Sequence, residues 1–351
     1  NHTMKLKKLL PKNFDDLLAE GDVDALKAVF AACSVDARGG YSKQTAFAFN
    51  EFPDELCRWL VEQGADVSAA DSYGDTPLQS RAGHWQGRLD ILLDLGADVH
   101  SGEGGRGTAL HKACGVGHAD NVRLLLQRGA NPDALTADGL TPLEWALQRC
   151  SNTGIVGIAK VAPIMLAAGA RQTPRMEEFI TQIGTQFEFH RAGFNRDSVD
   201  EYSAALDRLY SLFAVAPVPR RAMHDGRSPI AVKAGAWQDQ HEALWDLLVP
   251  SNGPAATVQG EVIRLSGRIA NELDGNGGVN WGADFRRMVD ALLGHLGSGT
   301  SLPAEQLDAA AVTAKAIKQK SGEPARLCEM AVHWVVCNPT PVALPAVDYR
   351  R

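Results

Sequence analysis

Apolar residues along this chain follow the spacing of helices in both halves. In the N-terminal half, the short apolar runs 91–93 and 124–126 predict the buried faces of short helices. In the C-terminal half, Val262, Leu265 and Ile269 recur three or four residues apart, which is the spacing of one helix face. Alternating polar and apolar positions, the signature of strands, are scarce. The pattern therefore predicts an all-α protein.

The apolar runs of the N-terminal half are followed by a recurring phrase. Gly-Ala-Asp-Val begins at Gly64 and at Gly96, Gly-Ala-Asn-Pro begins at Gly129, and a weaker Gly-Ala-Arg begins at Gly169. The intervals between these glycines are 32, 33 and 40 residues. Glycine suits the left-handed position that ends a helix, so each phrase predicts the end of a helix.

A second phrase keeps step with the first. Thr-Pro-Leu begins at Thr76 and Thr141, Thr-Ala-Leu-His begins at Thr108, and a degenerate Thr-Ala-Phe begins at Thr45. Threonine can cap a helix with its hydroxyl, and proline at the first helical position loses no hydrogen bond. Two phrases locked at a period of about 33 residues resemble the ankyrin repeat, whose signature is Thr-Pro-Leu-His-x-Ala. The resemblance implies an ankyrin-repeat solenoid of helix pairs and β-turn fingers that binds another protein.

The two phrases divide the chain as follows. We predict an N-terminal tail at 1–13, ankyrin repeats at 14–172, a helical connector at 173–216 and a C-terminal helical domain at 217–351. The repeats comprise a degenerate cap to about residue 36 and four repeats at roughly 37–70, 71–100, 101–133 and 134–172. Fingers are expected near 41–44, 72–75, 104–107 and 137–140. The fourth repeat has seven extra residues around 150–157, expected as an exposed loop or a helix extension.

Helical spacing continues after the repeats. It predicts helices at about 199–213, 239–248, 257–273, 282–296, 303–320 and 323–337. Three phrases there resemble a helical region attached to other bacterial proteins: Leu-Trp-Asp-Leu-Leu-Val-Pro from Leu244, Gly-Glu-Val-Ile-Arg from Gly260, and Asn-Gly-Gly-Val-Asn-Trp from Asn276. That resemblance implies no reaction.

Composition narrows the function further. The chain of 351 residues has 45% hydrophobic and 22% charged residues, which is globular composition. A formal net charge of -7 argues against sequence-independent binding of nucleic acid, which needs clustered cations. No apolar run reaches the length of about 20 residues that spans a membrane, and the N-terminus lacks the apolar stretch of a signal peptide. The six cysteines form no C-x-x-C pair. We therefore expect a cytoplasmic protein with no nucleic-acid or membrane partner.

Motifs for catalysis, cofactors or metals are missing from the sequence. It contains no phosphate-binding G-x-x-x-x-G-K-[ST], no H-E-x-x-H and no G-x-S-x-G. The Gly-rich turn 276–278 could hold an anion at a helix start, but a plain helix–helix turn is the preferred interpretation. Glu261 and Arg264 are interpreted as a pair on a solvated helix face. His333 and Cys337 lie one helical turn apart without a second pair. We predict no cofactor, no metal and no catalytic residue.

The expected binding surface follows from ankyrin geometry, because finger tips and the ends of first helices face the concave groove. A bacterial inhibitor or immunity protein is one specific form of this hypothesis. The predicted partner-binding residues are Tyr41, Ser42, Gln44, Ser72, Tyr73, Asp75, Arg81, Arg106, Asp138, Leu140, Gln148 and Arg149. The alternative is an enzyme whose helical half is catalytic, with the repeats selecting the substrate and a pocket lined by Glu261, Arg264, Asn276 and Trp281.

Overall fold

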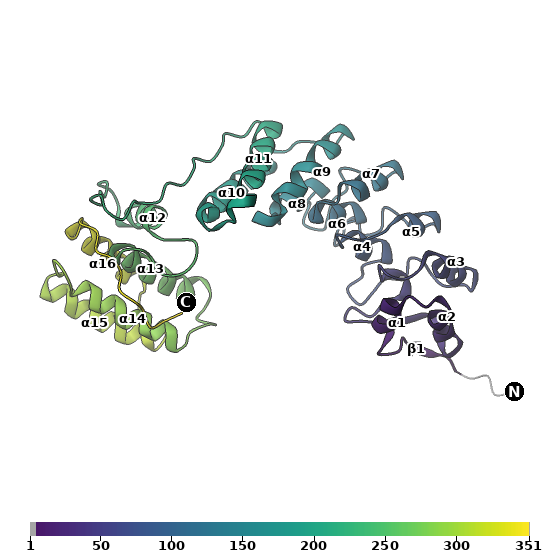
Figure 1. The fold of residues 1–351 in the computed structure, drawn as a ribbon, viewed down its shortest axis with the longest axis horizontal. Helices are drawn as coiled ribbons and strands as arrows, with labels where there is room; N and C mark the ends of the chain where they lie inside the picture. The colour runs from purple at the N-terminus through teal and green to yellow at the C-terminus, as the bar shows by residue number, and fades with distance from the viewer. Residues whose placement is uncertain (1–4, 351) are drawn as a thin grey trace. The chain divides into compact units, whose positions relative to one another are not determined.

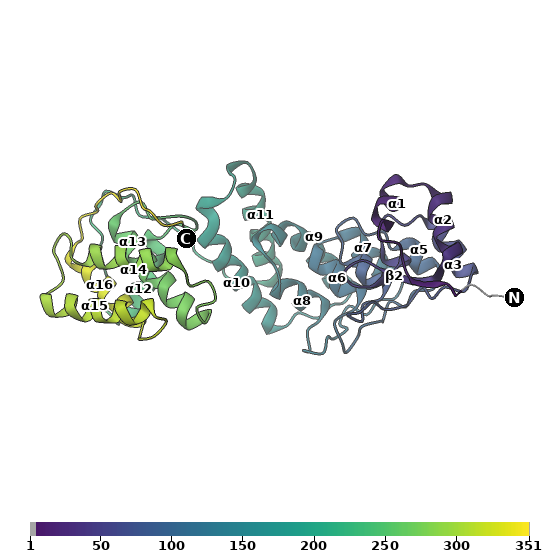
Figure 2. The same ribbon diagram turned by 90° about the horizontal axis from the view of Figure 1, so that it is seen from below.

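A computed structural model describes residues 5–350 (Figures 1 and 2). Its contacts group the chain into two units. The first unit, called here the repeat unit, contains residues up to 186 together with 196–218. The second, called here the helical unit, contains 187–195 and 219–351. Helices dominate both units, which confirms the all-α prediction.

The repeat unit is built from short helices that follow one another along the chain. They are α1 (Phe14–Glu20), α2 (Val23–Ala32), α3 (Asp54–Glu62), α4 (Pro77–Ala82), α5 (Asp90–Asp94), α6 (Ala109–Val116), α7 (Ala119–Gln127), α8 (Pro142–Gln148), α9 (Ile155–Ala167), α10 (Pro174–His190) and α11 (Arg196–Phe213). Single 3-10 turns occupy Ala46–Ala48 and Asn152–Gly154; a third, Arg191–Gly193, belongs to the helical unit together with the last residues of α10. The first helices α4, α6 and α8 pack side by side, as do the second helices α7 and α9 (Figure 1).

The two recurring phrases end and begin these helices as the sequence predicts. The side chains of Thr76 and Thr141 accept hydrogen bonds from the third residue of α4 and of α8, and both form capping boxes. The glycines of the Gly-Ala phrases have φ between 88° and 93°, the left-handed region in which a side chain is strained. Within the repeats the sequence therefore determines where most helices start and stop.

Buried polar side chains join one repeat to the next. The Gln79 amide donates to the carbonyl of Gly107 at 2.7 Å, and His111 Nε2 lies 3.0 Å from the carbonyl of Leu140. Burial lowers the pKa of His111, so its imidazole is neutral and can accept the Thr108 N–H through Nδ1. These bonds satisfy backbone groups at the repeat boundaries.

The N-terminal end departs from the predicted helical pattern. Strand β1 (Lys7–Leu9) runs parallel to β2 (Cys33–Gly39), which pairs antiparallel with β3 (Gln44–Thr45). The segment predicted as a tail at 1–13 therefore includes one strand of a three-stranded sheet. The strands are short and mostly polar, so they show no alternation that sequence analysis could detect.

The stretched repeat and the connector also differ in detail from expectation. The extra residues near 150–157 form a 3-10 turn and the start of α9, but Ile155 is fully buried, so they are not simply exposed. Gly117 and Gly157 approach closely, and a Cβ on Gly117 would lie 2.6 Å from the Gly157 Cα. Helix α10 lies within the predicted helical connector, although its bounds were not predicted. The predicted connector at 173–216 is divided between the two units: residues up to 186 and from 196 onward belong to the repeat unit, and 187–195 belong to the helical unit.

The helical unit contains helices at the predicted places. They are α12 (Trp237–Leu248), α13 (Val258–Ala270), a π-helical turn (Asn271–Gly275), α14 (Ala283–Leu296), α15 (Ala304–Lys318) and α16 (Ala325–Cys337). Helix α13 lies among the other helices of its unit (Figure 2) and packs against α12, α14 and α16. Most of its side chains are buried. The final segment pairs with the start of α13 through a bridge between Thr257 and Ala343.

Candidate functional site

The fingers of neighbouring repeats are linked through their backbones. The Ser72 N–H donates to the carbonyl of Ser42 at 2.8 Å, and the Ala137 N–H donates to the carbonyl of Gly105 at 2.8 Å. Side chains on these fingers therefore project from a backbone that is already ordered. Such order lowers the entropy that a binding surface loses when it meets a partner.

The finger at 71–75 is shaped by its first residue. Asp71 Oδ1 accepts the N–H of Tyr73 at 2.8 Å and the N–H of Asp75 at 3.1 Å. Gly74 has φ of 87°, which completes the tight turn. The turn leaves Tyr73 exposed at the tip of the finger.

Aromatic and cationic side chains meet at the finger tips. Tyr41 is 93% exposed, and its ring stacks on Tyr73 with the centroids 6.4 Å apart. The Arg106 guanidinium lies 5.6 Å from the centroid of the Tyr73 ring, within the range of a cation–π interaction. A hydrogen bond with Tyr41 raises the pKa of the Tyr73 hydroxyl, which keeps it protonated.

The surface continues into a hollow of about 370 Å³ at the first helices. It is lined by Asp75, Gln79, Ser80, Gly83, Lys112, Gly115, Val116, Trp145 and Arg149. Gly115 makes room for the indole of Trp145, because a Cβ there would lie 2.4 Å from the ring. A small residue in α6 thus allows a large one in α8 to lie beside it.

Two cations lie close to the ring of Trp145. The Arg149 guanidinium lies 4.4 Å from the ring centroid and the Lys112 ammonium 5.6 Å from it. We name the set of these residues the aromatic–cation surface: Tyr41, Tyr73, Arg106, Lys112, Trp145 and Arg149.

Ten of the twelve predicted binding residues reach the surface of the repeats. Exposed side chains are those of Tyr41, Ser72, Tyr73, Arg106, Asp138, Gln148 and Arg149, and half-buried ones are those of Ser42, Gln44 and Asp75. The structure brings together Tyr41 with Tyr73, and Arg106 with Asp75. Ser42 and Gln44 bond to each other at 3.1 Å.

The prediction for Arg81 needs correction, because its side chain is fully buried. Its Nε donates to the carbonyl of Phe47 at 2.7 Å and its Nη1 to the carbonyl of Arg88 at 3.2 Å. Desolvation lowers the pKa of this guanidinium. Arg81 occupies the position of Ala113 and Ala146 in the repeat phrase, which faces the interior.

Leu140 is likewise buried, with 5% of its surface exposed, and is not a binding residue. Its place directly before Thr141 puts it at the base of the finger rather than at the tip. The finger tip carries Asp138 instead, which is exposed.

Two residues of the aromatic–cation surface were missed by sequence analysis, Lys112 and Trp145. Both occupy the variable position of the Thr-Pro-Leu-His-x-Ala phrase, as does Ser80 in the preceding repeat. The structure places all three in the lining of the hollow. The variable position of the phrase was therefore the signal that could have found them.

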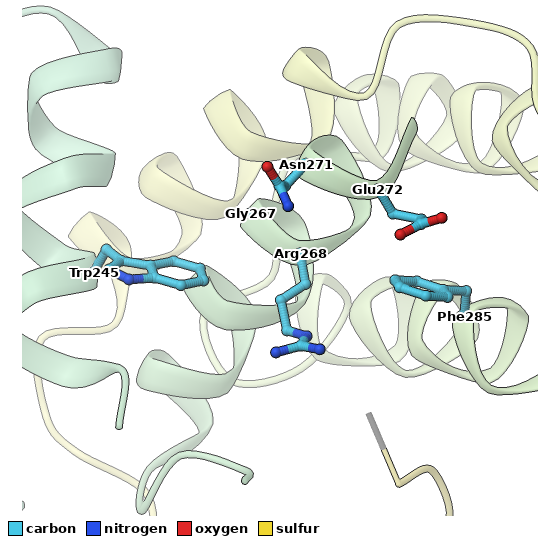
Figure 3. A pocket seen from close by; sticks show the side chains of 6 residues that line it. All are labelled: Trp245, Gly267, Arg268, Asn271, Glu272 and Phe285. Atoms are coloured by element: carbon cyan, nitrogen blue, oxygen red, sulfur yellow. The ribbon is translucent and has the colours of Figure 1, made fainter. Parts of the chain in front are cut away.

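The helical unit has a separate hollow of about 420 Å³ (Figure 3). Trp245 and Phe285 stand on opposite sides of it, with the Arg268 side chain between them, as Figure 3 shows. Gly267, Asn271 and Glu272 complete the lining. The carboxylate of Glu272 accepts a hydrogen bond from the N–H of Asn280 at 2.6 Å, which connects the loop before α14 to the π-helical turn.

The residues suggested for a catalytic pocket do not assemble there. Arg264 Nη2 pairs with Glu261 Oε1 at 2.9 Å inside the core, where the side chains are 2% and 0% exposed. This corrects the expected solvated pair. Asn276 bonds to Glu272, and the Trp281 indole donates to the carbonyl of Lys318. None of the four lines the hollow of Figure 3.

Other candidate groups have local partners. His333 Nδ1 lies 3.0 Å from Gln306 Oε1, and the Gly278 N–H donates to the carbonyl of Glu272 at 2.7 Å. Over residues 5–350, no group of three or more His, Cys, Asp or Glu side chains is arranged to hold a metal ion. In the same part of the chain, no helix is both long and apolar enough to cross a membrane.

Comparison with known proteins identifies the repeats. The family model described as ankyrin repeats in many copies matches residues 92–146. These residues run from α5 to α8 and include part of the lining of the hollow, namely Lys112, Gly115, Val116 and Trp145. The chain therefore contains ankyrin repeats, as the Thr-Pro-Leu and Gly-Ala phrases predicted.

Curated relatives share a stretch of this kind within larger proteins. The E3 ubiquitin-protein ligase hecd-1 of Caenorhabditis elegans is 41% identical over 95 residues, which is 26% of this chain and 4% of that protein. The E3 ubiquitin-protein ligase Ufd4 of Drosophila melanogaster is 34% identical over 123 residues, 34% of this chain and 4% of that protein. Ankyrin repeat and SOCS box protein 16 of Mus musculus is 34% identical over 97 residues, 25% of this chain and 21% of that protein.

The match thus spans at most about a fifth of each of these three relatives. All three are eukaryotic, and none is described as an inhibitor or immunity protein. They give no support to a bacterial origin of the chain or to the immunity hypothesis.

Proposed function

We propose that the repeat unit binds a partner protein across the aromatic–cation surface, and that the chain acts by binding rather than by catalysis. The observation that carries the proposal is the exposed cluster of Tyr41, Tyr73 and Arg106, which Asp75 and Lys112 connect to Trp145 and Arg149. Tyrosine, tryptophan and arginine are the residue types that dominate binding energy in protein interfaces.

The geometry of this surface suits recognition. Cation–π contacts hold Arg106 against Tyr73 and Arg149 against Trp145, so these long side chains are ordered before a partner arrives. Each rotamer-rich side chain that is already ordered spares about 0.5–1.5 kcal/mol on binding. Stacked repeats also form an extended surface without needing these residues for their own packing.

The comparisons support binding and leave the partner open. The matched family is a repeat family, and the relatives named above carry their ligase or SOCS-box names over lengths that this chain does not cover. Ubiquitin-ligase chemistry is therefore no part of the proposal.

Site-specific photo-crosslinking tests the proposal. A photoreactive phenylalanine analogue placed at Tyr73 is expected to form a covalent adduct with a partner protein in an extract of the source cells. The same analogue at Val312, which is 72% exposed in the helical unit, is the matched control. The analogue is also placed at Trp145. Adducts at position 312, with none at position 73 or 145, would contradict the proposal.

A further inference from the structure

We propose that the partner presents an acidic segment to the aromatic–cation surface, with one of its carboxylates seated in the hollow between Lys112 and Arg149. This inference rests on the proposed function, because it specifies the chemistry of the partner at the same site. It follows from the charge of the surface, the state of its ion pairs and the shape of the hollow.

The surface is locally basic on a chain whose formal net charge is -7. Arg106 and Lys112 lie near the carboxylate of Asp75, and the lining of the hollow carries two cations, Lys112 and Arg149, against this one carboxylate. The exposed acids Glu103 and Asp138 belong to neighbouring fingers and do not line the hollow. An acidic partner segment would thus be attracted to this part of the repeats, and charges of opposite sign also raise the rate of encounter.

The ion pairs of Asp75 leave its cations able to take another partner. Arg106 Nε and Lys112 Nζ each lie 3.6 Å from an Asp75 oxygen. A hydrogen-bonded pair of this kind is about 2.7–2.9 Å long, so neither cation is closely bonded to Asp75. Asp75 Oδ1 is buried and has no hydrogen-bond partner among the described residues. An incoming carboxylate could therefore make the short, charge-assisted bonds that Asp75 does not make.

The hollow matches an acidic side chain in shape as well as charge. Gly83 and Gly115 open it, and the indole of Trp145 forms one wall. Methylene groups of a glutamate can pack on that indole while the carboxylate reaches Lys112 and Arg149 from between them. The exposed rings of Tyr41 and Tyr73 lie on neighbouring fingers and can contact the adjoining part of an extended segment.

Selection from a displayed library of random 12-residue peptides, with the full chain as bait, tests this inference. We expect enriched peptides to contain clusters of Asp and Glu and to bind more weakly as salt rises. Binding of a synthetic copy is expected to fall at least tenfold in the double variant Lys112→Glu/Arg149→Glu. Because Lys112 is half-buried, Arg149→Glu alone serves as the second variant and should cause a smaller loss in the same direction.

The matched control reverses two cations of the second helix α7 and its C-terminal cap, Arg123→Glu/Arg128→Glu, with the same change in net charge. It should leave peptide binding within twofold of the unaltered chain. Enriched peptides that lack acidic residues yet lose binding in Tyr73→Ala and Trp145→Ala would overturn the acidic segment and leave the proposed function standing. Peptides indifferent to every one of these variants, or no enrichment at all, would overturn both.

Discussion

Charged side chains at the surface of the repeat unit and in the core of the helical unit serve opposite purposes. In the repeat unit, Arg106 and Arg149 lie at the surface against aromatic rings. In the helical unit, Arg264 is buried in α13 and pairs with Glu261, which also accepts the Tyr349 hydroxyl at 2.8 Å and the Ala255 N–H at 2.8 Å. Arg106 and Arg149 are thus available to a partner, whereas Arg264 and Glu261 hold a core together, as Arg81 does inside the repeat unit.

This difference shows why residue type alone does not define a site. Glu261 and Arg264 combine an acid and a base at helical spacing, which made them candidates for acid–base catalysis, yet they bond to each other, and Glu261 also bonds to Tyr349, inside the core. Their helix is surrounded by α12, α14 and α16, so its polar residues must find partners inside. In the repeats, the phrase itself separates interior positions from exposed ones.

Breaking the buried pair should have the largest effect. Glu261→Gln leaves the Arg264 charge buried without its counter-ion, and we expect a loss of about 3–5 kcal/mol in the free energy of unfolding. Chemical denaturation of the full chain measures it. Replacing both residues by methionine should recover much of the loss, and a Glu261→Gln variant as stable as the unaltered chain would show that the pair is dispensable.

Arg81→Ala and Arg149→Ala compare a buried and an exposed arginine within one unit. Arg81→Ala removes the hydrogen-bond donor of the carbonyls of Phe47 and Arg88. We expect the free energy of unfolding to fall by about 3 kcal/mol. Arg149→Ala should change stability by about 0.5 kcal/mol or less. Equal melting temperatures for the two variants would contradict the assignment of Arg81 to the interior.

Acid should weaken the helical unit through His241. Burial lowers the pKa of His241 from 6.5 to about 4, and its Nε2 lies 3.0 Å from Ser266 Oγ. The unfolded chain therefore binds a proton at His241 more tightly than the folded chain does. The contribution of neutral His241 to the free energy of unfolding is complete above pH 6.5 and is lost as pH falls toward 4. We expect a loss on the order of 2 kcal/mol between pH 7 and pH 5. Denaturation at both values should show a smaller loss in His241→Gln, and an equal loss would exclude His241 as the cause.

The repeats could be predicted because two short phrases recur in register. They located the fingers, the caps at Thr76 and Thr141 and the left-handed glycines. They place Arg81 at the alanine position of the phrase, but its burial was missed, because an arginine looks exposed until its hydrogen-bond partners are known. Lys112 and Trp145 were missed because the variable position of the phrase was not treated as a surface position.

Less of the helical unit could be predicted from the sequence, because each of its helices occurs once and no repeated phrase marks its ends. Apolar spacing located α12 to α16 to within a few residues. The π-helical turn at Asn271–Gly275 and the burial of Glu272 depend on contacts with Asn276 and Asn280, and the spacing of apolar residues does not predict such contacts. The hollow beside Arg268 is likewise formed by residues from three helices and the π-helical turn.

The most direct test measures the affinity of the crosslinked partner for the unaltered chain and three variants by titration calorimetry. Trp145→Ala is expected to weaken binding by about 1–3 kcal/mol. Trp85→Ala removes a tryptophan that is 68% exposed but lies outside the lining of the hollow, and it should bind unchanged. Binding that survives in Trp145→Ala but is lost in Arg268→Ala would contradict the account and move the site to the helical unit.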